Sequence, residues 1–405
     1  MLNNSCIVYT LLDAKRGGQC PPYEAMTDRD ALYHAILANP DDDTLRLVYA
    51  DALEEGGDPR RAAFVRTGVE LARVPAYDPL AIQARSHDEE SGARAELPPL
   101  PDGLSWPHDP FRRGLPGAVQ ARDGAAFVTH ADDLLARYPI ESLELAVVRL
   151  AEAADLAACP HLGRLRSLSF TQGVSRQGIG PLLDSEHLAR LTELHLGPQF
   201  TTAEAIGTLA RSRLFARLTS LSVRAERAGG AVTAALARQN PPRLKRLDIS
   251  GNRLTWLSLD QLLASTVLDS LEELDLSDNN LGPEGLAELE EAPLPNLRAL
   301  HLRHTRPGIE GVAVLTAAGF FRELRILSLG GNNLGPEAAL DLAGAPAANL
   351  LALDLSDNRI GDTGALALAQ STHLSGLLHL NLTGNAIDAP AASRLRKRFG
   401  DRVSL

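Results

Sequence analysis

The chain has 405 residues, a net charge of −11 at pH 7 and a pI near 5.5. Because nucleic acids and anionic membranes attract basic surfaces, this acidic balance argues against both as the main partner. Three cysteines, Cys6, Cys20 and Cys159, are too few and too scattered for a disulfide framework. No stretch has the apolar length of a membrane span, and the N-terminus lacks the basic flank of a secretory signal, so we expect a cytoplasmic protein.

Residues 1–25 fit no pattern that follows them in the chain. Met26 directly precedes Thr27, which suits a helix N-cap, and Asp30 follows three positions later. We therefore expect the natural chain to begin at Met26, with residues 1–25 as a disordered tail or an over-long gene prediction.

Residues 26–75 predict three short helices, because apolar side chains recur at helical spacing and the stretches NPDDDT and GGDP interrupt them. Residues 26–74 resemble the bacterial repeat-companion domain, a module found N-terminal to repeat arrays, and the most specific piece is RLVYADALEEGGDPRRAAFVR, residues 46–66. The family's usual Trp–Leu–Glu–Glu run reads Ala-Leu-Glu-Glu at residues 52–55. The resemblance implies a small all-α module and carries no activity with it.

Residues 76–110 are rich in proline and charge, which predicts a linker with one short helix around residues 78–95. Residues 111–139 predict a cap for the array that follows. FRRGLPGAVQA, residues 111–121, is expected to form an edge strand, and AAFVTHADDLLARYP, residues 125–139, a helix. Such a cap would cover unpaired backbone groups and leucines at the open end of the array.

The pattern L-x-x-L-x-L-x-x-N-x-L recurs through residues 140–390 at intervals of 25–27 residues. Strong copies begin at Leu244, Leu271, Leu324, Leu350 and Leu377. Weaker copies begin at Ile140, Leu165, Leu191, Leu218 and Leu297. A period held this tightly indicates ten stacked repeats, numbered here in chain order, each of which buries its apolar face against its neighbours.

One repeat shows how the pattern specifies a fold. In LEELDL, Leu274 and Leu276 alternate with polar residues, which predicts a short strand with its leucines on one face. Asn279 falls where the chain turns away, and a buried amide there can satisfy backbone groups that no strand reaches. Gly282-Pro283 then opens a helix. The result is a right-handed strand–helix coil with parallel strands inside and helices outside.

These repeats resemble the leucine-rich repeat family, closest to the ribonuclease-inhibitor-like class, whose helix entry is matched by NRIGDTGALALAQ at residues 358–370. The resemblance implies an α/β solenoid of horseshoe form. The asparagine column is replaced at five positions: Val148, Gly173, Gln199, Glu226 and Thr305. We therefore expect the first four repeats to be looser. Residues 391–405 predict a C-terminal cap, whose basic run at residues 394–398 is better interpreted as a solvated helix face than as a partner patch.

The exposed positions beside the second and third leucine of each repeat form the candidate partner-binding face. They are polar and mostly small, and the tryptophan, tyrosine and arginine anchors typical of binding hot spots are scarce. Solubility alone would also require polar residues there, so no single residue is assigned a role. The candidates are Glu193, His195, Arg224, Arg246, Asp248, Glu273, Asp275, His301, Arg303, Asp354, His379 and Asn381.

The sequence gives little sign of catalysis or metal binding. His195, His301 and His379 fall in repeats 3, 7 and 10, on the order of 15 Å or more apart at normal strand spacing, too far to share one ion. His301 and His304 as a pair are a weak metal signal. Phosphate-binding loops and HExxH are missing from the sequence, and Cys159 is predicted to be a buried inter-repeat residue. We expect no catalytic, metal or cofactor site.

The leading hypothesis is a monomeric, non-enzymatic scaffold that binds a protein partner of unknown identity through its repeats. One alternative is a regulator of a partner enzyme, such as a GTPase-activating scaffold, since some repeats of this class do that work. A second is an unrecognised hydrolytic or metal-dependent activity in the N-terminal module, near Asp51, Glu54, Glu55 and Asp58. A third is one of many loosely constrained paralogues with little individual role.

Overall fold

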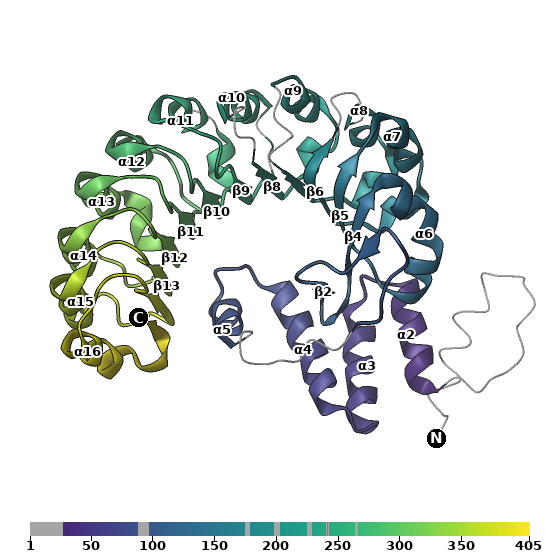
Figure 1. Cartoon of the computed structure of the whole chain (residues 1–405), viewed down its shortest axis with the longest axis horizontal. Coiled ribbons are helices and arrows are strands. Elements are labelled where there is room, and N and C mark those ends of the chain that lie inside the picture. The colour runs from purple at the N-terminus through teal and green to yellow at the C-terminus, as the bar shows by residue number, and fades with distance from the viewer. Residues whose placement is uncertain are drawn as a thin grey trace, which may run out of the picture. The chain divides into compact units, whose positions relative to one another are not determined.

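A computed structural model describes residues 27–87, 97–174, 179–197, 203–224, 229–239, 241, 243–263 and 266–405. The expectation of a disordered tail at residues 1–25 lies outside these ranges. The described chain forms two compact units (Figure 1). The first comprises residues 27–73, 111–117 and 133–139, and the second comprises the remaining described residues from 74 onward.

The first unit is the predicted helical module, with α2 (Asp28–Ala38), α3 (Asp43–Glu55) and α4 (Pro59–Arg73). Helix α2 begins with a capping box, in which the Thr27 hydroxyl accepts from the backbone N–H of Asp30 and the Asp30 carboxylate accepts from that of Thr27. The core joins side chains from all three helices to Leu115. An all-α region at residues 28–73 is thus confirmed.

The stretch that we predicted as a single edge strand, residues 111–121, is instead divided. β2 (Phe111–Arg112) and β3 (Leu115–Pro116) form a hairpin of their own, and β4 (Ala118–Asp123) lies one place inside the main sheet. The reason is local, because Arg113 and Gly114 both have positive φ, of 50° and 72°, which closes a tight two-residue turn. The edge of the sheet is β1 (Leu104–Ser105), paired antiparallel with β4.

The second unit contains a sheet of 13 strands in the order β1-β4-β5 and then consecutively to β15 (Val403–Ser404). Each repeat strand begins two residues after its repeat does, and the second leucine of each repeat pairs in register with that of the next, as Leu274 does with Leu300. The repeat strands are β5 (Ser142–Val148), β6 (Ser167–Val174), β7 (Glu193–Leu196), β8 (Ser220–Val223), β9 (Arg246–Asp248), β10 (Glu273–Asp275), β11 (Ala299–His301), β12 (Ile326–Ser328), β13 (Ala352–Asp354) and β14 (His379–Asn381).

Helices return the chain along the outer side of this unit, and strands line the inner side (Figure 1). The helices are α6 (Gly124–Arg137), α7 (Leu150–Ala157), α8 (Ile179–Leu183), α9 (Ala203–Arg211), α10 (Gly229–Gln239), α11 (Trp256–Leu263), α12 (Gly282–Glu291), α13 (Gly308–Ala317), α14 (Gly335–Gly344), α15 (Gly361–Gln370) and α16 (Ala389–Phe399). Parallel strands that alternate with helices in one continuous array confirm the predicted solenoid. None of the helices in the described ranges is both long and apolar enough to cross a membrane.

Buried asparagines satisfy backbone groups, as predicted, and in doing so they join successive repeats into a ladder. Asn279 Nδ2 donates to the carbonyl of Ile249 in the preceding repeat (3.0 Å) and of Leu276 in its own (2.9 Å). Its Oδ1 accepts from the backbone N–H groups of Asn252 (3.0 Å) and Leu254 (2.9 Å). Asn332, Asn358 and Asn385 repeat this arrangement. Each asparagine therefore forms hydrogen bonds with buried backbone groups that have no partner in the short three-residue strands.

The positions where the asparagine column is replaced differ in what they do. Thr305 is fully buried, and its hydroxyl donates to the carbonyl of Leu302 in its own repeat (2.8 Å). Val148 is a buried apolar residue at the end of β5. Gln199 and Glu226 lie outside the described residues.

The C-terminal segment covers the last repeat. Arg402 Nη1 donates to the carbonyl of Leu377 (2.7 Å), and Arg398 donates to the carbonyls of Ala369 (3.0 Å) and Ser371. Leu395 and Phe399 are on the buried side of α16. One member of the basic run, Arg398, is thus held in the cap by backbone carbonyls.

Candidate functional site

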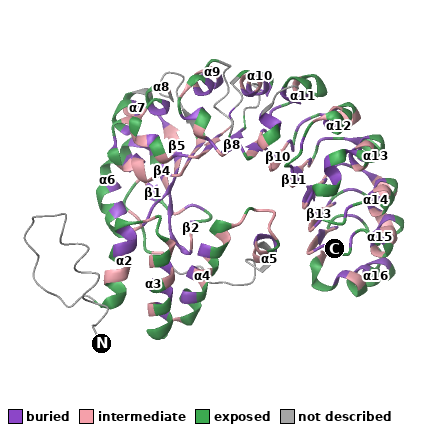
Figure 2. Ribbon diagram, turned by 180° about the vertical axis from the view of Figure 1, so that it is seen from behind, coloured by how far each residue is buried: buried purple, intermediate pink, exposed green. Residues whose placement is uncertain are grey.

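The strand face turned away from the helices is called here the inner face. Its side chains are half-buried, whereas the outward sides of the helices are exposed (Figure 2). A central column runs along it through repeats 5–10, formed by Asp248, Asp275, His301, Ser328, Asp354 and Asn381. Columns on either side hold the other candidate residues.

The acidic members of the central column each close the turn at the end of their own strand. Asp275 Oδ1 accepts the backbone N–H of Ser277, two residues on, at 2.8 Å. The same contact recurs at three other repeats: Ser250 to Asp248, Ser356 to Asp354, and Thr383 to Asn381. A recurring Asp-x-Ser in the sequence was the signal for this role. One oxygen of each of these side chains is therefore used for local structure.

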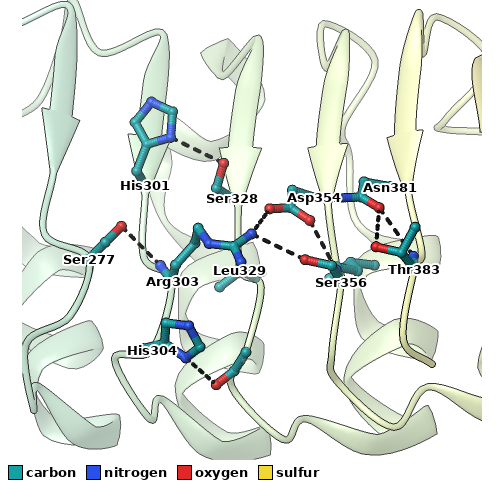
Figure 3. Close-up of polar contacts among 12 residues, drawn as sticks. Ser277, His301, Arg303, His304, Ser328, Leu329, Asp354, Ser356, Asn381 and Thr383 are labelled. Carbon is teal, nitrogen blue, oxygen red and sulfur yellow. Dashed lines mark hydrogen bonds and ion pairs between the residues drawn. The ribbon is translucent and has the colours of Figure 1, made fainter. Parts of the chain in front are cut away.

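Arg303 links repeats that are two apart (Figure 3). Its guanidinium Nη1 contacts Asp354 Oδ2 on β13 and donates to Ser356 Oγ at 3.1 Å. To do so it passes over repeat 8 at Gly330, where a Cβ would lie 2.4 Å from Nη1. The Arg303 side chain is 38 % exposed and that of Asp354 19 %, so the ion pair lies at the surface and only partly in solvent.

His301 is held between two neighbouring repeats. Its Nε2 lies 3.4 Å from Glu273 Oε1, and its Nδ1 lies 3.1 Å from Ser328 Oγ (Figure 3). His304 contacts the carbonyl of Gly331 instead, at 3.0 Å. Among the residues that the structure describes, no group of three or more histidine, cysteine, aspartate or glutamate side chains is placed to hold a metal ion.

The candidates in the earlier repeats also pair across the array. Arg246 Nη2 on β9 lies 2.6 Å from Glu193 Oε1 on β7, passing repeat 4 at the small residue Ser220. Arg224 lies 3.8 Å from Asp278, and its Nε donates to Ser250 Oγ at 3.0 Å. The structure thus brings together Glu193 with Arg246, Glu273 with His301, and Arg303 with Asp354. His195 on β7 and His379 on β14 lie at opposite ends of this set.

Burial raises the pKa of Asp275 above its ordinary value, and the neighbouring Asp248 carboxylate adds to the rise, while hydrogen bonds from Ser277 and the charge of His301 oppose it. Glu272, at the margin of the face, behaves differently. Its burial is outweighed by donors on Lys245 and Tyr77, so its pKa lies below the usual range.

Sequence reasoning missed a second component of the inner face, residues 74–87. This segment includes α5 (Pro79–His87), and its Tyr77 hydroxyl donates to Glu272 Oε2 at 2.7 Å. Ile82 packs against Ala299 and Ile326. The signal was available, because polar positions of the earlier repeats are apolar at Ala299, Ile326, Leu351, Ala352 and Leu378.

Comparisons with known proteins agree with this architecture. A family model described as Leucine Rich repeat matches residues 269–289, 322–343 and 347–369, and another Leucine Rich Repeat model matches residues 243–263. The chain is 34 % identical over 271 residues to the Tonsoku-like protein of Bos taurus, covering 61 % of this chain and 19 % of that protein. It is 32 % identical over 168 residues to Tubulin-specific chaperone E of Danio rerio, covering 39 % of this chain and 30 % of that protein.

The chain thus spans less than a third of the length of either curated relative. Among solved structures it is similar to the complex of Rad7 and Elc1 in yeast, at 17 % identity and a TM-score of 0.49 over 67 % of this chain and 72 % of that one. It is also similar to an internalin from Listeria monocytogenes, at 19 % identity and a TM-score of 0.39 over 64 % and 71 %. On the matched families and the strand–helix repeats together, the chain carries leucine-rich repeats.

Proposed function

We propose that the chain is a non-enzymatic interaction scaffold that binds a protein partner through the inner face of its repeats. The observation that carries this is the pair Arg303–Asp354, which fixes opposite charges from repeats 7 and 9 at a half-exposed surface. Side chains held in place before binding lose less conformational entropy on association, which favours a surface that recognises another molecule. Charges of both signs fit a polar protein surface better than a polyanion.

The relatives support a protein as the partner. One curated relative is named as a chaperone specific for tubulin, which is itself a protein. Repeat arrays also bind by presenting side chains from several units at once, and the paired residues of this face come from repeats 3 to 9.

The acidic cluster of the N-terminal module does not favour the hydrolytic alternative. Arg66 Nη2 lies 2.6 Å from Asp51 Oδ1 and 2.6 Å from Glu54 Oε2, so two of its four carboxylates are already in an ion pair. Exposed pairs of this kind are common on helix surfaces and contribute little to stability. They support a structural interpretation of the cluster.

We propose further that the chain is a monomer. The two ends of the main sheet are the two-residue strands β1 and β15, and short edge strands discourage pairing with a second sheet. Light scattering on the eluted peak of a sizing column should give 43.3 kDa for the full chain. A mass near twice that value would contradict the proposal.

Affinity capture from the source organism tests the function directly. The full chain, Arg303→Glu and Asp354→Arg are used as baits, with Glu290→Arg on the outer helix α12 as a matched control. We expect a protein retained by the parent and the control and lost from both inner-face variants, followed by the same order of affinities with that protein purified. Equal retention by all four baits would place binding elsewhere, and retention by none would remove the support for a scaffold.

A further inference from the structure

Residues 74–87 are called here the strap, because they lie across the inner face of repeats 6–10. One anchor of the strap is Tyr77. Its hydroxyl donates to Glu272 Oε2 at 2.7 Å, and the Arg325 guanidinium lies over its ring at 5.9 Å from the centroid. Glu272 also accepts from Lys245 Nζ at 2.8 Å, so one carboxylate holds both a strand neighbour and the strap.

The second anchor is Ile82, which is only 4 % exposed although it lies on a two-turn helix. It packs on Ala299 and Ile326, and Leu351, Ala352 and Leu378 join the same cluster with Tyr77. These five residues, three within strands and two directly before a strand, are called here the apolar strip. Helix α5 also touches β14, so the strap reaches the last repeat strand.

The apolar strip is specific to the repeats that the strap covers. The two positions before the second leucine read Thr-Glu at residue 192, Thr-Ser at 219, Lys-Arg at 245 and Glu-Glu at 272. They then read Arg-Ala at 298, Arg-Ile at 325, Leu-Ala at 351 and Leu-His at 378. A strand position facing solvent has no reason to be apolar unless something covers it. The strip and the strap are therefore complementary parts of one contact.

The helix of the strap is short. Asp78 starts its helix, with Oδ1 accepting from the backbone N–H of Leu80 at 2.9 Å and Pro79 at the first helical position. Helices as short as nine residues are marginal on their own in water, so α5 depends on the face beneath it. Tyr77 and Ile82 provide contacts to this face, and Ala81 next to Ile82 is buried as well.

We propose that the apolar strip is a helix-binding groove, that the strap is its displaceable internal occupant, and that the protein partner binds there by replacing the strap. The partner then presents an aromatic hydroxyl two residues before a short amphipathic helix, and a branched apolar side chain on that helix five residues after the aromatic one. The hydroxyl takes the place of Tyr77 on Glu272, and the apolar side chain takes that of Ile82. That a protein partner binds in this groove rests on the proposed function. That the groove binds a helix does not rest on it.

A labelled peptide of residues 74–87 tests the groove without any partner. Tyr77→Ala/Ile82→Asp releases the strap in the full chain, and Pro79→Asp is the control, because it adds the same charge at an exposed position in the same helix. In the parent and the control, the strap itself competes with the peptide at an effective concentration on the order of millimolar. The peptide should therefore bind the released chain at least about tenfold more tightly than it binds either of them. Adding Leu378→Asp, at the half-buried position directly before β14, should remove that binding.

Equal peptide affinity for the parent and the released chain, or no binding to the released chain, would overturn the proposal. A circular dichroism spectrum and a urea midpoint unchanged from the parent show that each variant has kept its array. Once a partner is captured, the released chain should bind it more tightly than the parent does, and weaker or unchanged binding argues against competition. Failure to capture any partner would count against the proposed function and leave the peptide result standing.

Discussion

The guanidinium of Arg303 occupies the space that a side chain at Gly330 would need. The nearest guanidinium nitrogen lies 2.4 Å from the position of a Cβ there, and the same nitrogen contacts Asp354. Repeat 8 therefore permits the contact between repeats 7 and 9, because residue 330 has no side chain to block it. The glycine is a structural part of the inner-face ion pair, although it belongs to neither partner.

Gly330→Ala is expected to displace Arg303 from Asp354 and to lower the free energy of unfolding only slightly, by about 1 kcal/mol, because the obstructed group is the flexible end of a side chain. Urea unfolding measures the cost. Much of it should vanish in an Arg303→Ala background, since the guanidinium is then gone and only the Ser356 hydroxyl, 2.8 Å from the added Cβ, remains close. Gly344→Ala is the control, because a Cβ there has nothing within 4 Å. A cost that persists in full without Arg303 would place the strain at Ser356 or in the backbone.

Asn279→Ala is expected to destabilise the chain by roughly 3 kcal/mol or more, because it leaves two buried carbonyls and two buried N–H groups without the amide that they contact. The adjacent Asn280→Ala, at an exposed position, should change the free energy of unfolding by less than about 0.5 kcal/mol. Urea denaturation of the two variants side by side makes the comparison. Equal effects would mean that the ladder contributes nothing beyond turn propensity.

Asp275→Asn is expected to stabilise the chain at neutral pH. The pKa of Asp275 is raised in the folded chain, so its ionised form is disfavoured there, and the penalty is present above the folded pKa. The penalty disappears as the pH falls below the ordinary aspartate pKa near 4, where both states are protonated. Asparagine can still accept from Ser277. Unfolding free energies of parent and variant should therefore differ at pH 7 and converge by about pH 3.5, and a constant difference would contradict this.

Leu274→Asp is expected to unfold several neighbouring repeats, because the side chain is fully buried and a charge there has no partner. The loss should be at least about 4 kcal/mol, since removing the leucine alone costs 2–5 kcal/mol. Leu257→Asp is the matched control, because that leucine is 59 % exposed on α11. Thermal melts followed by circular dichroism compare the two, and a melt of Leu274→Asp that coincides with the parent's would remove Leu274 from the core.

The periodicity of the sequence predicted most of the fold, because each repeat is specified by local spacing and contacts only its neighbours. The position of Leu274 in its strand and the role of Asn279 both follow from alternation and from the backbone groups of short strands. The hairpin at Arg113 and Gly114 could not be read in this way, since positive φ at a non-glycine residue leaves little trace in sequence. Its prediction as one continuous edge strand was therefore wrong.

The candidate site was only partly accessible to sequence reasoning. The column positions of His301, Arg303 and Asp354 followed from the repeat, and whether they bind a partner stays a prediction. The contacts between them depend on side chains that extend across one or two repeats, and the spacing of residues in the sequence does not show which side chains do so. The apolar residues of the later repeats indicate that something covers them, but they do not identify the strap, because Tyr77 and Glu272 are 195 residues apart in the chain.

The asparagine ladder has a direction. Each amide accepts from N–H groups of the repeat before it and donates to a carbonyl of that repeat, as Asn358 does toward Asn332 and Leu329. A duplicated or deleted unit of 26 or 27 residues brings or removes its own donors and acceptors together, so the array can change length by whole modules. Repeats of 26 and 27 residues pair in the same register, so an extra residue outside the strand leaves the next strand in place. Growth by internal duplication is thus built into the hydrogen bonding of the array.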